Sequence, residues 1–238
     1  MTSPAKSTPT ATAGRIRGVL FDLDGLMFNT EVVFHLTGTE ILRRRGKLAR
    51  PEIFRAMQGR RAEEAWPVMI QMAELTDTID ALEAEAHELF PTFLEAHLAP
   101  MPGLLPLLET LTAAGVPRVV ATSSGRDYAR ELLDRFKLTD GFDAILGAED
   151  VSVGKPAPEI YQKAAAALAL PPEETLVLED TEAGINAGKG AGATAVAVPH
   201  EHSHGQTYPT ADLVLDTLAD RRLYELLGLS APGKEAAP

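Results

Sequence analysis

Short apolar segments alternate with helical patterns over most of the chain. The apolar segments are bounded by Gly, Pro or Asp, as strands usually are, and they lie at Gly18–Phe21, Arg118–Ala121, Ala144–Leu146, Thr175–Leu178, Thr194–Val198 and Leu213–Leu215. Apolar residues at helical spacing occur between them, at Leu104–Ala114, Asp127–Phe136, Glu159–Leu168 and Ala183–Gly188. Strands that alternate with helices predict a parallel sheet with helices on both faces. The predicted fold class is α/β, with a doubly wound, Rossmann-like core.

One block interrupts this alternation. Between residues 30 and 100 no segment has strand character, and apolar residues recur at helical spacing instead. The clearest stripe contains Ile79, Leu82, Ala86, Leu89 and Phe93. An all-helical block inserted after the first strand predicts a separate cap that could close over the core.

The predicted domains follow from this block. The catalytic core is expected at 15–29 and 101–229, and the helical cap at 30–100. Residues 1–14 and 230–238 are rich in small polar residues, Ala and Pro, and they are predicted to be disordered tails.

Composition narrows the class of protein. The chain has 238 residues, 45% of them hydrophobic, which is enough to bury a sizeable core. It has no cysteine, which excludes thiolate chemistry and is typical of a reducing compartment, so we expect a cytoplasmic location. A net charge of -12 argues against non-specific nucleic-acid binding. The uncharged stretches are too short and too often broken by proline to span a bilayer.

Two acidic pairs follow two of the predicted strands. Asp22 and Asp24 come directly after the first apolar run, and Glu179 and Asp180 come after the fourth. Residues i and i+2 of a strand share a face, so Asp22 and Asp24 can converge on one point. Gly25 then permits a sharp turn and the close approach of a ligand. A few carboxylates, water and phosphate oxygens are the ligands that Mg²⁺ prefers.

Groups that could bind an anion also follow strands. Thr122 and Ser123 come after the second run and before a helix, so their hydroxyls and the helix N-terminus could face an anion. Lys155 lies in a loop that Pro156 and Pro158 stiffen. Because ligands of open α/β sheets bind outside the carboxyl ends of the strands, we expect all these groups to gather at one edge.

This set of groups suits phosphoryl transfer. A carboxylate that attacks a phosphate dianion meets a repulsion on the order of 4 kcal/mol per charge pair at about 4 Å. Mg²⁺ and Lys155 are the available cations, and they would supply the electrostatic stabilisation that this chemistry mostly requires. Aspartate is a known covalent nucleophile for phosphoryl groups. The predicted cofactor is therefore Mg²⁺.

Four segments resemble, in order and spacing, the motifs of the haloacid dehalogenase superfamily: FDLDG, Thr122–Ser123, GKPAPEIY and LEDTEAGI. The resemblance spans roughly residues 15 to 228 and is to the branch of β-phosphoglucomutase-like phosphatases. It implies that Asp22 forms an aspartyl-phosphate and that Asp24 is the general acid and base. Dehalogenases and phosphonatases of the superfamily lack an acidic residue at the position of Asp24, so phosphate ester chemistry is implied.

The same resemblance assigns the other polar groups. Thr122 and Lys155 would hold the phosphoryl oxygens, and Glu179 would be an outer-sphere partner of the metal. The implied Mg²⁺ ligands are Asp22, Asp180 and the main-chain carbonyl of Asp24.

The helical cap resembles the cap of the family, which favours small phosphometabolites as substrates. Arg60 could bind a substrate anion or simply begin the helix that contains Trp66. Asn29 stands where many members have an acidic residue, and with Ser123 it is a candidate phosphate or substrate contact. β-Phosphoglucomutase uses a histidine of the cap linker where this chain has Phe34, which disfavours a mutase.

A run of histidines after the fifth apolar segment leaves three interpretations open. His200, His202 and His204 could bind a transition metal, contact the substrate, or form a polar loop at the rim of the site.

The function predicted from the sequence is a Mg²⁺-dependent phosphatase acting on a small phosphate monoester. A sugar phosphomutase that uses the same aspartyl-phosphate is the enzymatic alternative. A non-enzymatic binding module on the same scaffold is disfavoured because no motif residue is missing. We expect a small phosphorylated metabolite as partner, no nucleic acid or membrane, and a monomer or weak dimer.

Overall fold

A parallel sheet forms the centre of the molecule. The computed structural model describes residues 16–57, 62–200, 203 and 206–232. Within them six strands pair in the order β3-β2-β1-β4-β5-β6. They are β1 (Gly18–Phe21), β2 (Arg118–Ala121), β3 (Ala144–Leu146), β4 (Thr175–Glu179), β5 (Thr194–Ala197) and β6 (Leu213–Val214). All pairings are parallel and the chain winds outward from β1 in both directions, which confirms the predicted doubly wound α/β core.

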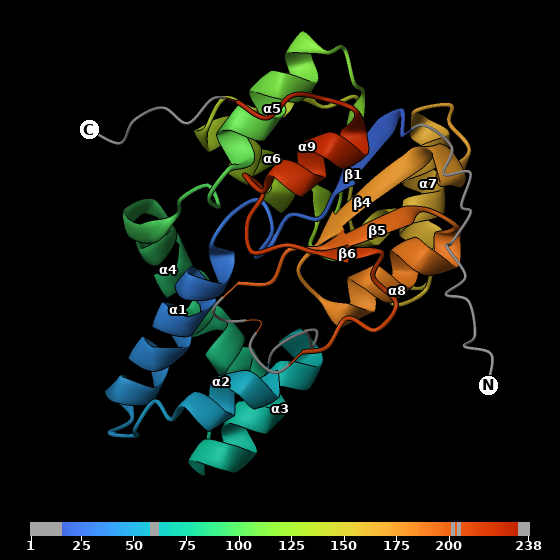
Figure 1. Cartoon of the computed structure of the whole chain (residues 1–238). Helices are drawn as coiled ribbons and strands as arrows, with labels where there is room; N and C mark the ends of the chain where they lie inside the picture. The colour runs from blue at the N-terminus through green and yellow to red at the C-terminus, as the bar shows by residue number, and fades with distance from the viewer. Residues whose placement is uncertain (1–15, 58–61, 201–202, 204–205, 233–238) are drawn as a thin grey trace, which may run out of the picture.

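Helices cover both faces of this sheet (Figure 1). One face carries α5 (Leu104–Ala113), α6 (Arg126–Arg135) and α9 (Arg221–Leu227), and the other carries α7 (Glu159–Ala167) and α8 (Glu182–Ala191). Side chains alternate along a strand, so neighbours on β1 serve opposite layers. Phe21 packs in the layer that contains Leu132, and Leu20 packs in the layer that contains Ile185.

A helical cap lies between β1 and α5. It consists of α1 (Thr30–Arg44), α2 (Pro51–Met57), α3 (Ala62–Ala73) and α4 (Ile79–His97). Its helices bury a hydrophobic core separate from the two core layers, and this core contains Ile41, Leu42, Ile53, Met69, Ala73 and Leu82. The cap extends away from the sheet below the ends of its strands in Figure 1.

Asn29 joins the two segments that connect cap and core. Its main-chain N–H donates to the Ala99 carbonyl at 3.1 Å, and its Oδ1 accepts from the Ala99 N–H at 2.7 Å. Its Nδ2 donates to the His97 carbonyl at 3.0 Å. We predicted Asn29 as a phosphate or substrate contact, but both polar atoms of its amide are used here within the linkers, because the two segments lie side by side at this residue.

The elements agree closely with the sequence pattern. Every predicted strand is present, with ends that differ by at most one residue. Helix α8 extends beyond its predicted range because Gly188 and Gly190 weaken the apolar pattern in its second half. Helix α9 was not predicted, since it is short and buries only Leu223, Tyr224 and Leu227. Among the described residues, none of the helices has the length and apolar character that crossing a membrane requires.

Candidate active site

The predicted nucleophile lies at the end of the central strand. Asp22 follows β1 directly, and its main-chain N–H donates to the Leu178 carbonyl at 3.0 Å, which continues the pairing of β1 with β4. Its side chain is buried, and Lys155 Nζ donates to its Oδ1 at 2.5 Å. Burial raises the pKa of Asp22, Lys155 opposes this rise, and the carboxylates of Glu179 and Asp180 add to it. The carboxylate is thus fixed in surroundings that favour a nearby cation.

Lys155 is the cation of this site. Besides Asp22, its Nζ donates to Glu179 Oε1 at 2.7 Å and to the Ala121 carbonyl at 3.0 Å, and it lies 4.9 Å from the centre of the Tyr161 ring. The side chain is only 6% exposed. Burial alone lowers the pKa of Lys155, but Asp22 and Glu179 outweigh it, so the pKa is raised. The ammonium group is therefore a permanent charge at neutral pH.

Glu179, the last residue of β4, is surrounded by protein donors. Its Oε1 accepts from Lys155 and from the Tyr161 hydroxyl at 2.8 Å. Its Oε2 accepts from the Thr181 hydroxyl at 2.9 Å and from the N–H groups of Asp180 and Thr181 at 3.0 and 3.1 Å. These bonds assign Glu179 to holding Lys155 and the start of α8 in place.

Asp180 keeps one oxygen without a partner. Its Oδ2 lies 3.1 Å from His200 Nε2 and accepts from the Ser203 hydroxyl at 3.3 Å. Its Oδ1 is buried and has no hydrogen-bond partner in the part of the chain that the structure describes. Since a buried polar atom without a partner is costly, this oxygen has the capacity to bind a cation.

The carboxylates form a cluster that could hold a metal. One oxygen from each of Asp22, Glu179 and Asp180 lies within 4.8 Å of the others. Burial raises the pKa of Asp180, and the carboxylates of Glu179 and Glu31 raise it further. A hard dication would neutralise this excess of negative charge, and the donor set fits Mg²⁺. Because the Glu179 oxygens already have several donors, Asp22 and Asp180 are the side chains best able to bind it.

Gly25 closes the turn that leads away from Asp24. It has a φ of 80°, and a Cβ at this position would lie 2.6 Å from both Asp180 Oδ2 and His200 Nε2. Only glycine allows this backbone conformation and this close approach without strain. The turn predicted at Gly25 is confirmed.

The carboxylate of Asp24 has a different set of neighbours from that of Asp22. Its Oδ2 accepts from the Ser124 hydroxyl at 2.6 Å and lies 3.4 Å from the Thr122 hydroxyl, which is itself buried. Its Oδ1 accepts from the Tyr128 hydroxyl at 3.3 Å. The carboxylate of Asp24 is thus outside the metal cluster, and a metal contact through its main-chain carbonyl stays a prediction.

Several neighbours of the site were missed from the sequence. Ser123, which we predicted as a phosphate contact, is exposed, and the adjacent Ser124 has the contact with Asp24. The direction of each hydroxyl depends on the turn after β2, which sequence alone does not determine. Tyr128 lies in the first turn of α6, directly after the Thr122–Ser124 segment, so its position at the start of the helix that follows β2 was the available signal.

Glu31 is a further acidic neighbour that the sequence analysis did not single out. It lies in the first turn of α1, at the cap side of the site. Burial raises the pKa of Glu31, Asp24 raises it further, and His200 opposes this rise. It adds negative charge to the site from the cap.

Three predicted groups fall outside the residues that the structure describes. They are Arg60 in the cap and His202 and His204 in the loop after β5. The remaining member of the histidine run, His200, lies beside Asp180.

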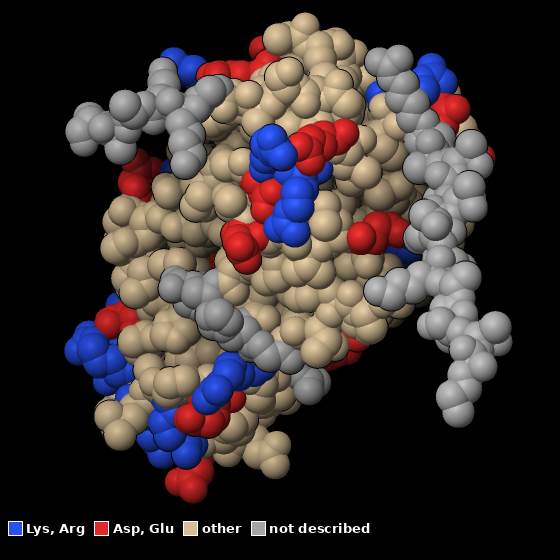
Figure 2. All heavy atoms as spheres, viewed as in Figure 1, with Lys and Arg blue, Asp and Glu red and all other residues tan. Residues whose placement is uncertain are grey.

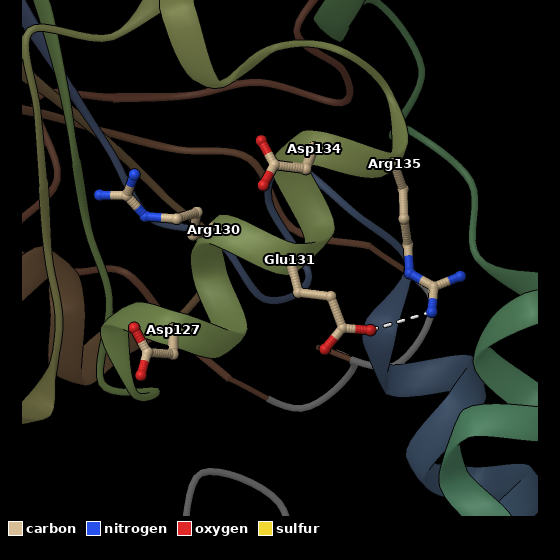
Figure 3. Close-up of a pocket in the computed structure, with 5 residues that line it drawn as sticks. All are labelled: Asp127, Arg130, Glu131, Asp134 and Arg135. Atoms are coloured by element: carbon tan, nitrogen blue, oxygen red, sulfur yellow. Dashed lines mark hydrogen bonds and ion pairs between the residues drawn. The ribbon is translucent and has the colours of Figure 1, made fainter.

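A hollow on the outer surface is separate from these groups. It has a volume of about 570 Å³ and is lined by Asp127, Arg130, Glu131, Asp134 and Arg135, all on α6 (Figure 3). Glu131 and Arg135 form an ion pair at 2.9 Å. None of the side chains around Asp22 or Asp24 lines it, so it is not part of the candidate site.

Comparisons with known proteins agree with this geometry. The sequence model described as "Haloacid dehalogenase-like hydrolase" matches residues 19–198. The chain is 36% identical over 172 residues to validoxylamine A 7'-phosphate phosphatase of Streptomyces hygroscopicus subsp. limoneus, covering 71% of this chain and 79% of the relative. It is 32% identical over 228 residues to the probable pseudouridine-5'-phosphatase of Drosophila melanogaster, covering 91% and 96%.

A solved structure shares the whole architecture. The putative β-phosphoglucomutase of Thermotoga maritima superposes with a TM-score of 0.74 at 26% identity, covering 90% of this chain and 97% of that one. The match confirms the branch that the four motifs indicated, and the family model covers all of those motifs. This chain belongs to the haloacid dehalogenase-like hydrolase family.

Proposed function

We propose that this protein is a Mg²⁺-dependent phosphatase that hydrolyses small phosphate monoesters through an aspartyl-phosphate on Asp22. The main observation is the arrangement at the end of β1. There the Asp22 carboxylate meets the Lys155 ammonium at 2.5 Å, while Asp24, two residues on, is surrounded by hydroxyl groups. A nucleophile, a fixed cation and a proton donor thus lie next to one another.

Asp22 and Asp24 divide the chemistry between them. In the first half-reaction an oxygen of Asp22 attacks phosphorus, the bond from phosphorus to the leaving oxygen breaks, and protonated Asp24 gives its proton to that oxygen. In the second, the Asp24 carboxylate takes a proton from water while the water oxygen attacks phosphorus. The bond to Asp22 then breaks and its electron pair returns to the carboxylate. Phosphate leaves and Asp24 is again protonated.

Cations reduce the repulsion between Asp22 and the phosphate. Each charge pair costs on the order of 4 kcal/mol at about 4 Å and an effective dielectric near 20. Lys155 is well placed for this role, since its ammonium group contacts Asp22 directly. Mg²⁺ held by Asp22 and Asp180 would neutralise charge on the phosphoryl oxygens.

The charge of the molecule argues against a polyanionic partner such as nucleic acid, and the relatives support a small substrate. The chain carries a net charge of -12. On the face shown in Figure 2, Lys and Arg lie beside Asp and Glu and do not form one basic patch. The two phosphatase relatives are named for small phosphorylated compounds.

A screen of small phosphate monoesters, with Mg²⁺ and with a chelator, tests the proposal. We expect phosphate release that requires Mg²⁺ and falls more than about 10³-fold in Asp22→Asn, since the nucleophile is lost. Isomerised product with little phosphate release would indicate a phosphomutase instead. The absence of turnover on every ester, or full activity of D22N, would contradict the proposal.

A further inference from the structure

Tyr128 lies between the cap and the predicted general acid. It is on α6, and its hydroxyl donates to Asp24 Oδ1 at 3.3 Å. Burial raises the pKa of Tyr128, and Asp24 raises it further, in agreement with this contact. The geometry thus makes the Tyr128 hydroxyl a hydrogen-bond donor to Asp24.

Ser124 holds the other oxygen of the same carboxylate. Its hydroxyl donates to Asp24 Oδ2 at 2.6 Å, while Tyr128 donates to Oδ1. When each oxygen of a carboxyl group accepts a hydrogen bond, the rotation of the group about the Cβ–Cγ bond is fixed. This matters because a proton can be transferred only to an oxygen within hydrogen-bond reach and along the right direction.

The cap contacts the ring of Tyr128 through an aromatic side chain. Phe90 of α4 lies 6.1 Å from the Tyr128 ring, between centroids, and Phe34 of α1 lies 4.9 Å from Phe90. Such distances are within the range of favourable aromatic pairs. The row of rings Phe34, Phe90 and Tyr128 therefore extends from the cap to the hydroxyl that binds Asp24.

We propose that Tyr128 is a positioning residue that orients the Asp24 carboxyl toward the leaving oxygen, and that Phe90 of the cap supports the Tyr128 ring by packing against it. This inference rests on the proposed function, since it concerns the proton that Asp24 gives to the leaving group. Tyr128 itself exchanges no proton in the cycle. The packing of Phe90 couples the position of the cap to the position of the acid.

Comparing substrates whose leaving groups differ in basicity distinguishes the positioning of Asp24 from a general structural role of Tyr128. An alkoxide is a poor leaving group and needs the proton of Asp24, whereas 4-nitrophenolate leaves without one. The constant kcat/KM reports the steps up to the release of the leaving group, so it includes the transfer of that proton. Disorientation of Asp24 should therefore lower kcat/KM for an alkyl phosphate selectively.

The experiment compares kcat/KM of Tyr128→Phe for glycerol 2-phosphate and for 4-nitrophenyl phosphate, both with Mg²⁺. We expect a loss of about tenfold or more on the alkyl ester, a fraction of the 10²–10⁴-fold that a general acid contributes, and a change within about twofold on the aryl ester. Phe90→Leu should show the same selectivity with a smaller loss. Ser124→Ala provides a second variant in which the other oxygen loses its donor.

Tyr224→Phe is the matched control. Tyr224 is fully buried on α9, and its hydroxyl has no hydrogen-bond partner among the described residues, so its removal should leave both constants unchanged. Equal losses of Y128F on both esters would indicate a structural role and overturn the inference, as would no loss on either. If the unmodified enzyme hydrolysed neither ester nor any other in the screen, the proposed function itself would fail, and the inference with it.

Discussion

Lys155 compensates two buried carboxylates at once. Its ammonium group lies within hydrogen-bond distance of both Asp22 and Glu179, and all three side chains are at most 10% exposed. A buried charge without its partner is far more costly than an exposed one. The residue that we propose to hold the phosphate is thus also needed to compensate these two buried carboxylates.

Replacing Lys155 tests this dual role. We expect Lys155→Met to lower the free energy of unfolding without metal by about 3–5 kcal/mol, the usual cost of breaking a buried pair. Lys163→Met is the matched control, because the Lys163 ion pair with Glu159 is exposed and worth about 1 kcal/mol or less. Urea denaturation measures both, and equal effects of the two substitutions would contradict this role of Lys155.

Asp180 makes the stability of the metal-free protein depend on pH. Its pKa is raised by burial and then by the Glu179 and Glu31 carboxylates, so the folded state binds this proton more tightly than the unfolded state does. Ionisation of Asp180 therefore costs stability as the pH rises above about 4, the usual pKa of an aspartate. Below that pH the group is neutral in both states and the cost is absent.

Asp180→Asn removes this ionisation. In chelator, we expect the stability of D180N relative to the unmodified protein to increase as the pH rises from about 4 toward 7, by about 1.4 kcal/mol for each unit by which the pKa is raised. Urea denaturation at a series of pH values measures the difference. A difference in stability that stays constant with pH would show that the pKa of Asp180 is not raised in the folded protein. With Mg²⁺ the order should reverse, because the unmodified protein gains stability by binding and the variant loses a ligand.

At the scale of elements, the start of α8 has to leave room for Glu179. A Cβ at Gly184 would lie 1.7 Å from Glu179 Oε1 and 2.4 Å from Oε2. Glu179 cannot move aside easily, because Lys155, Tyr161 and Thr181 all donate to its carboxylate. The glycine is thus required by the site and not by the helix.

A pair of glycine substitutions in α8 checks this explanation. Gly184→Ala should destabilise the protein by about 1–3 kcal/mol, as overpacking of a core does, and should also reduce phosphatase activity by displacing Lys155. At Gly190 a Cβ would meet only the Pro158 ring, at 3.4 Å, so Gly190→Ala should be neutral or stabilise by up to about 1 kcal/mol. Thermal unfolding compares them, and similar melting temperatures would contradict the explanation.

The elements were easier to predict than their side-chain contacts. Strand ends such as Phe21 and Leu178 could be placed because an apolar run stops at a charged residue. Which of Ser123 and Ser124 faces Asp24 could not, since it depends on the turn after β2. The linker role of Asn29 also required the structure, because its partners Ala99 and His97 are about seventy residues away in the chain.

At the scale of the whole molecule, two parts with separate cores meet at the candidate site. The core contributes Asp22, Asp24 and Lys155, and the cap approaches through Phe90, with Glu95 of α4 forming an ion pair with Arg135 of α6 at 2.5 Å. The motifs of the core could be found in the sequence because they lie at strand ends, where position determines function. The cap has no such rule, so for the cap the sequence offered only Arg60 as a candidate contact with the substrate, and Arg60 lies outside the described residues.

The most direct test of the account is the detection of a phosphoryl group on Asp22. In Asp24→Asn with Mg²⁺ and 4-nitrophenyl phosphate, the first half-reaction needs no acid and the second lacks its base, so the phosphoenzyme should accumulate. Rapid acid quenching, proteolysis and mass spectrometry should then find one phosphoryl group on the peptide that contains Asp22, with a matching burst of nitrophenolate. Release of phosphate by the unmodified enzyme, together with an unmodified Asp22 peptide and no burst in D24N, would contradict the covalent mechanism.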